Sequence, residues 1–203
     1  MNIGRGWGWH RGWVNRPAGY WWGAASFTAM TAWLPWASTG YWATPAYCSY
    51  GTGGDVYYEG DTVYVSGSPV SAGEYYEQAA GIAAAAPEEP PAEDVEWLPL
   101  GVFAIAVEES GTSHRYLQLA ISKEGVIAGT FYNELTDSTR PIEGTVDQQT
   151  QRAAFTFADG ENTDIVMETT LGNLSKDEST ALVHFGDVTT QTWLLVRLEE
   201  PEG

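Results

Sequence analysis

Hydrophobic and polar residues alternate through most of the second half of the chain. Phe103, Ile105 and Val107 share one face of the first alternating stretch, and Leu117 and Leu119 continue the pattern in the next. A period of two residues is typical of a β-strand with one face in a core. The pattern predicts strands at residues 101–108, 115–122, 126–133, 140–147, 152–158, 164–171, 181–185 and 192–199.

The connections between these strands are short and rich in turn residues, as at Lys123-Glu124-Gly125. Connections of this length require neighbouring strands to run antiparallel. Glycines in strands, or at their ends, favour the bends that curl a sheet, and they occur here at Gly129, Gly144, Gly172 and Gly186. We therefore predict a mainly β protein whose C-terminal domain, residues 95–203, is an eight-stranded antiparallel up-and-down barrel. A sandwich of two four-stranded sheets is the alternative.

Residues 55–86 are predicted to form a second unit. Two β-rich stretches, 56–58 and 62–65, flank Gly60 and predict a β-hairpin, and a further turn follows at 66–69. Ser71 and Glu74 have the spacing of a helix capping box, and good helix formers continue to Ala86. Residues 87–94 hold three prolines and four acids, which predicts an extended acidic linker.

Residues 1–54 form an aromatic arm that contains eight of the ten tryptophans, interleaved with glycine. Three interpretations remain open. The arm is a signal peptide, with arginines ahead of an apolar run; an interfacial segment, because Trp and Arg favour a membrane surface; or a segment that docks on protein. The residues predicted to make its contacts are Trp7, Trp9, Trp13, Trp21, Trp22, Trp33, Trp36 and Trp42.

Charge is divided unevenly along the chain, whose net charge is −18. Residues 1–54 contain three arginines and no acid, whereas residues 55–203 contain six basic and 27 acidic residues. The scarcity of clustered Lys and Arg argues against nucleic acid as a partner. The opposite signs of the two parts favour a contact of the arm with the acidic body or with an anionic surface.

The sequence shows no strong signature of catalysis. Its three histidines lack the spacing of a metal site, and it has neither a nucleophile elbow nor a phosphate loop. Oxygen ligands alternate from Asp159 to Asp164 as calcium would require, but Asp-Gly between two strands already predicts a turn. The single Cys48 is interpreted as a small buried side chain. We predict no enzyme activity, no cofactor and no metal.

Several segments resemble uncharacterised planctomycete proteins labelled mu-protocadherin-like cell-surface protein, and the resemblance extends over most of the chain. They are residues 56–67, 74–79, 97–104, 117–125, 181–186 and 192–198. The resemblance implies a cell surface and brings no established activity, and the calcium motifs of cadherin repeats, such as Asp-x-Asn-Asp-Asn, do not occur here. The rhythm of residues 129–132, 141–147 and 154–157 is also similar to calycin and avidin barrels.

Two functions follow from these patterns. The leading prediction is a non-catalytic protein of the cell envelope or the extracellular space. Its aromatic arm would mediate attachment to, or assembly with, a second copy of the protein, another envelope protein or a membrane surface. Its barrel would be a folded head. If the arm serves attachment alone, removing residues 1–54 leaves a folded β protein. The alternative is a barrel that binds a small ligand at its mouth.

Overall fold

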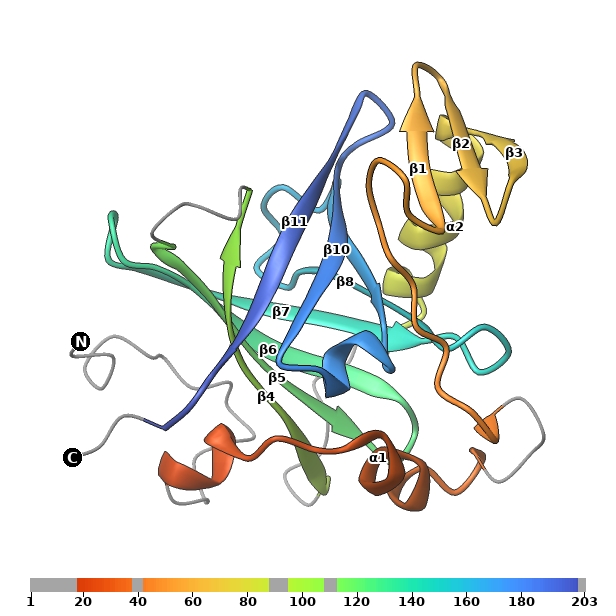
Figure 1. Ribbon diagram of the computed structural model, residues 1–203. Helices are drawn as coiled ribbons and strands as arrows, with labels where there is room; N and C mark the ends of the chain where they lie inside the picture. Colours follow the sequence, from red (N-terminus) through yellow and green to blue (C-terminus); the bar gives the residue numbers. More distant parts are fainter. Residues whose placement is uncertain (1–17, 38–41, 88–94, 108–112, 201–203) are drawn as a thin grey trace.

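The computed structural model describes residues 18–37, 42–87, 95–107 and 113–200 of the 203-residue chain. Eight antiparallel strands form a closed barrel in sequence order, and the last strand pairs with the first. The predicted up-and-down barrel is confirmed (Figure 1). Its strands are β4 (Trp97–Ala106), β5 (Arg115–Ser122), β6 (Val126–Asn133), β7 (Ser138–Val146), β8 (Arg152–Phe157), β9 (Ile165–Thr170), β10 (Glu178–Phe185) and β11 (Thr189–Leu198).

Four barrel strands begin earlier than the hydrophobic pattern predicts, and for β7 the difference is two residues. Strand β4 begins four residues before the predicted start, and β10 and β11 begin three residues before theirs. Pairing with a neighbour explains the difference, since Trp97 lies opposite Ser122 and Glu178 opposite Val196. Backbone hydrogen bonds to an adjacent strand hold these residues in the sheet although their side chains do not alternate.

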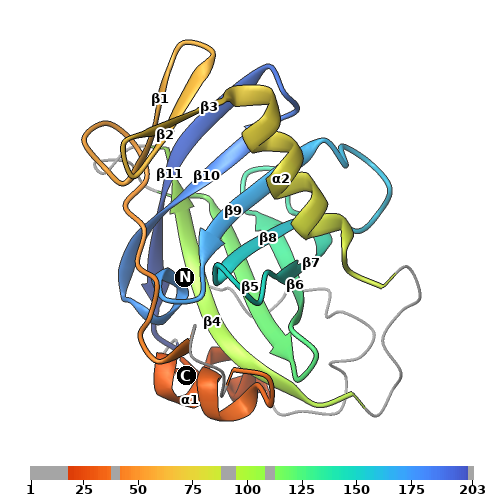
Figure 2. The same ribbon diagram turned by 90° about the vertical axis from the view of Figure 1, so that its right-hand side faces the viewer.

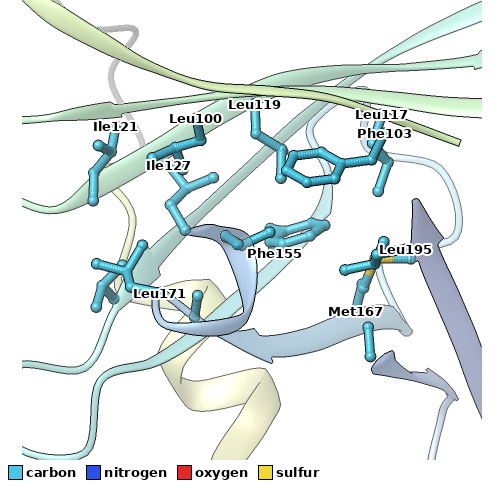
Figure 3. Packing of buried hydrophobic residues seen from close by; sticks show 14 of the residues in the cluster. Leu100, Phe103, Leu117, Leu119, Ile121, Ile127, Phe155, Met167, Leu171 and Leu195 are labelled. Atoms are coloured by element: carbon cyan, nitrogen blue, oxygen red, sulfur yellow. The ribbon is translucent and has the colours of Figure 1, made fainter. Parts of the chain in front are cut away.

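The barrel core fills the lower part of the interior. Phe103 and Leu119 are fully buried there and meet Phe155 from the opposite wall (Figure 3). Odd-numbered residues of β5, of β8 and of the part of β4 after its bulge between Pro99 and Gly101 point inward, as the alternation in the sequence predicts. The result is one continuous apolar cluster inside the closed sheet.

Two of the four predicted bend glycines lie within barrel strands, Gly129 in β6 and Gly144 in β7, whereas Gly172 and Gly186 lie in turns. At Gly144 the neighbouring strand β8 comes so close that a Cβ atom would overlap its backbone and the Phe155 side chain. A glycine at this position is therefore a packing requirement of the closed barrel.

Replacing Gly144 by alanine is expected to lower the free energy of unfolding by about 1–3 kcal/mol, because the new methyl group overlaps backbone that cannot move without shifting a strand. The matched control is Gly81→Ala in helix α2 (Ala72–Ala84), where a Cβ meets no neighbour. That change is expected to stabilise the protein by roughly 0.5–1 kcal/mol. Denaturant unfolding of both variants measures the difference, and equal effects would contradict the packing argument.

The unit of residues 55–86 contains one more strand than predicted, while the predicted linker lies outside the described residues except for Pro87. Strands β1 (Val56–Glu59), β2 (Thr62–Val65) and β3 (Ser68–Ser71) form a three-stranded sheet, and residues predicted as a turn supply part of β3. The predicted helix cap is present, because the Ser71 hydroxyl accepts a hydrogen bond from the Glu74 amide at 3.2 Å. Figure 2 shows α2 along the outside of the barrel.

Helix α2 packs on the outer faces of β7, β8 and β9. Ala79 and Ala83 are buried against Ala154 and Val166. Small side chains on the helix and on the sheet allow the two surfaces to approach closely, and this explains why an alanine-rich helix of low apolar content is stable here. The unit of residues 55–86 is thus part of one packed body with the barrel.

Candidate functional site

The lower end of the barrel is closed by the described part of the aromatic arm. A short 3-10 helix, η2 (Ala18–Trp22), and helix α1 (Phe27–Trp33) lie across this end in both ribbon views (Figures 1 and 2). Met30 and Leu34 are completely buried and join the same apolar cluster as the barrel interior. The arm therefore completes the core of the barrel.

Five of the eight predicted contact tryptophans lie in the described residues, and all five are buried or half-buried in the chain's own fold. Trp42 donates from Nε1 to the carbonyl of Gln148 at 2.8 Å, and Trp36 donates to the carbonyl of Lys123 at 2.9 Å. Trp21 packs on the outer face of the sheet. The remaining positions are Trp22 and Trp33, both half-buried.

Trp7, Trp9 and Trp13 lie outside the described residues, so attachment through them stays a prediction. Trp36 and Trp42 contact the chain's own barrel, because the carbonyls to which they donate belong to turns at the barrel's lower end. Sequence reasoning found these tryptophans from their density and favoured a contact of the arm with the acidic body, but it did not place them at the end of the barrel, because no local pattern shows which surface they cover.

The opposite, upper end of the barrel is open and holds a cavity of about 470 Å³. Its floor is formed by Phe155 and Met167 from strands β8 and β9. Aromatic side chains contribute much of the wall, and these are Phe131, Phe157, Phe185 and Trp193. Aliphatic residues complete it, namely Ile105, Val107, Leu117, Ile142, Ile165 and Val183.

Two arginines line the cavity on inward-facing strand positions. Arg115 begins β5 two residues before Leu117, and Arg140 lies in β7 two residues before Ile142. Because side chains alternate between the faces of a strand, each arginine shares the inner face with its apolar neighbour. The sequence contained this signal, since both arginines are in phase with the inward residues.

Arg140 is held by the loop between β8 and β9. Its Nε and Nη2 atoms donate to the two carboxylate oxygens of Asp159 at 2.6 and 2.7 Å, and its guanidinium lies 3.5 Å from the ring centre of Phe157. These hydrogen bonds lower the pKa of Asp159. The Asp159–Asp164 segment, considered above for calcium, thus forms a loop whose first carboxylate pairs with an arginine.

Arg115 has a different setting. Its guanidinium lies 5.3 Å from the ring centre of Trp193, and the indole of Trp193 donates to Gln191 at 2.9 Å. Within the described ranges, no carboxylate forms an ion pair with Arg115. Arg115 therefore presents a positive charge at the cavity mouth.

A second polar cluster lies outside the barrel wall, beneath α2. Glu168 of β9 is fully buried and receives hydrogen bonds from Arg152 at 2.9 Å to each oxygen and from the Tyr75 hydroxyl at 2.8 Å. His184 lies 3.6 Å away through Nε2 and donates to or accepts from Thr190 through Nδ1 at 2.9 Å. Sequence reasoning missed this cluster because its members come from five different elements, helix α2 and strands β8 to β11.

The cluster attaches α2 to the barrel. Burial by itself would raise the pKa of the Glu168 carboxyl, but the contacts with His184 and Arg152 outweigh it and lower the pKa. Cys48 lies nearby and is half-buried, and burial raises the pKa of its thiol to about 11. Both groups are therefore held in one protonation state at neutral pH, with Glu168 charged and Cys48 neutral.

No protein-family model, curated protein or solved structure matches the chain. In the part of the chain that the structure describes, no helix combines the length and apolar character needed to cross a membrane. In the same part, no group of three or more His, Cys, Asp or Glu side chains is placed to hold a metal ion.

Proposed function

We propose that the barrel binds a small, mainly apolar molecule at its open end. The observation that carries this proposal is the cavity of about 470 Å³ lined by aromatic and aliphatic side chains. Sites for small molecules in proteins have volumes of roughly 300–1,000 Å³, apolar walls and a few polar groups. The cavity matches each of these properties.

The position of the cavity supports the same function. Below Phe155 the inward-facing side chains meet and fill the barrel, whereas at the upper end Phe131, Phe157 and Phe185 remain only partly buried. An apolar ligand seated on them would remove this surface from water, at roughly 25 cal/mol for each Å² covered. The walls belong to paired strands, so the site is largely pre-formed before the ligand arrives.

Replacing Ile165 by tryptophan is expected to weaken binding of a neutral fluorescent naphthylamine at least tenfold. Ile165 lies at the mouth on the inner face of β9 and is partly exposed, so the larger ring enters the cavity without disturbing the core below. Probe emission measured against protein concentration gives the dissociation constant.

The control for this experiment is Val188→Trp, which adds a ring to an exposed turn that does not line the cavity. This variant is expected to bind the probe as the unaltered protein does. Equal weakening by both substitutions, or no probe binding by the unaltered protein, would contradict a site at the open end of the barrel.

A further inference from the structure

We infer that the ligand is an anionic amphiphile whose carboxylate or phosphate group binds Arg115 while its apolar part enters the barrel. This inference rests on the proposed function and adds the charge class of the ligand. It follows from how the two arginines of the cavity are used, and from where the acidic residues lie.

Arg115 is placed to meet a ligand at the mouth. It occupies the first inward-facing position of β5, directly above Leu117, and so lies between solvent and the apolar wall. The Trp193 ring beside it, with its own N–H bound to Gln191, supports one face of the guanidinium. An arginine offers a planar set of donors that matches carboxylate or phosphate oxygens.

Arg140, in contrast, is already occupied. Both oxygens of Asp159 bind it, and the carbonyl of Glu161 accepts a further hydrogen bond at 2.7 Å. The net charge of the Arg140–Asp159 pair is zero. Of the two cavity arginines, Arg115 is therefore the one whose charge is available to a ligand.

The cavity wall contains no acidic residue among those that the structure describes, although the chain has 27. A cationic ligand would consequently meet Arg115 without a compensating carboxylate from the described part of the wall. The aromatic faces on which a cation could stack are those of Trp193 and Phe157. Both already lie against the protein's own arginines. The wall thus favours an anion and disfavours a cation.

The apolar surroundings strengthen this preference. An ion pair gains more Coulomb energy where water is partly excluded than in bulk water. An anion also needs a partner there, because burying a charge without one is costly. A ligand with an apolar chain and one terminal anion satisfies both ends of the site, with the chain over Phe155 and Met167 and the charge at Arg115.

The test compares dodecanoate with dodecanol, which share a chain and differ in charge, as competitors of the neutral naphthylamine probe bound to the full-length protein. Dodecanoate is expected to bind at least tenfold more tightly than dodecanol. In Arg115→Gln the affinity for dodecanoate should fall about tenfold and that for dodecanol should stay unchanged, whereas Arg115→Lys, which keeps the charge, should retain most of the dodecanoate affinity.

The matched control is Lys123→Gln, which removes a cation paired with Glu96 in the β5–β6 turn, away from the cavity. It should change neither affinity. Equal binding of both competitors, their failure to displace a bound probe, or an Arg115→Gln variant with undiminished dodecanoate affinity overturns the anion inference and leaves the proposed function standing. A folded protein that binds no probe overturns the proposed function itself.

Discussion

Deletion of residues 1–54 is expected to yield a barrel that does not fold stably and that aggregates. Met30, Leu34 and Trp42 are buried in the same cluster as the barrel interior, so their removal exposes the lower end of that core to water. An arm that served attachment alone would leave a folded, monodisperse β protein. Near-ultraviolet circular dichroism and size-exclusion chromatography of the truncated chain distinguish the two outcomes.

A point substitution makes the same test in the full-length chain. Leu34→Ala is expected to lower the free energy of unfolding by about 2–5 kcal/mol, because Leu34 is only 1% exposed and a cavity would replace its side chain. Leu135→Ala is the matched control, since Leu135 is 72% exposed in the turn between β6 and β7 and should change stability by less than about 0.5 kcal/mol. Similar effects of the two changes would contradict a role of the arm in the core.

Replacing Arg152 by methionine is expected to lower the free energy of unfolding by about 3–5 kcal/mol. The substitution leaves the Glu168 carboxylate fully buried without its cation, although Tyr75 and His184 remain beside it. Adding Glu168→Met in the same chain removes the stranded charge and should recover a large part of the loss. Urea unfolding of the single and double variants measures both effects.

The control for the buried pair is Arg140→Met. The Arg140–Asp159 pair has similar geometry, but its side chains are 20% and 27% exposed, so its loss should cost no more than about 1 kcal/mol. Equal costs at Arg152 and Arg140 would show that burial of Glu168 does not decide the effect. A pronounced loss of amide protection in α2 of Arg152→Met would show that the cluster holds this helix on the barrel.

The lowered pKa of Glu168 sets the sign of the pH dependence of this contribution. A carboxyl group whose pKa is lower in the folded protein than in the unfolded chain stabilises the fold above its ordinary pKa. This stabilisation disappears as the pH falls through the lowered value. The difference in stability between the unaltered protein and Arg152→Met should therefore be largest near neutral pH and should shrink in acid.

The barrel strands were predictable because a closed β-barrel repeats one local rule. Each strand places residues such as Phe103, Ile105, Leu117 and Leu119 at alternate positions, and short turns leave only antiparallel neighbours. The same rule places Arg115 and Arg140 in phase with the inward residues, although the pattern alone did not single them out as cavity residues. The alternation does not show at which level along the barrel axis the interior changes from packed core to cavity.

The sequence by itself determined the strands of the barrel, their antiparallel order, the capped helix and the uneven charge, because each depends on residues close together in the chain. Only the tertiary structure decided that the tryptophan-rich arm completes the core, that Glu168 is buried with Arg152, and that Arg115 faces a cavity without a carboxylate partner among the described residues. These features join segments separated by many residues. Their energies come from burial and pairing, which exist only once the sheet has closed.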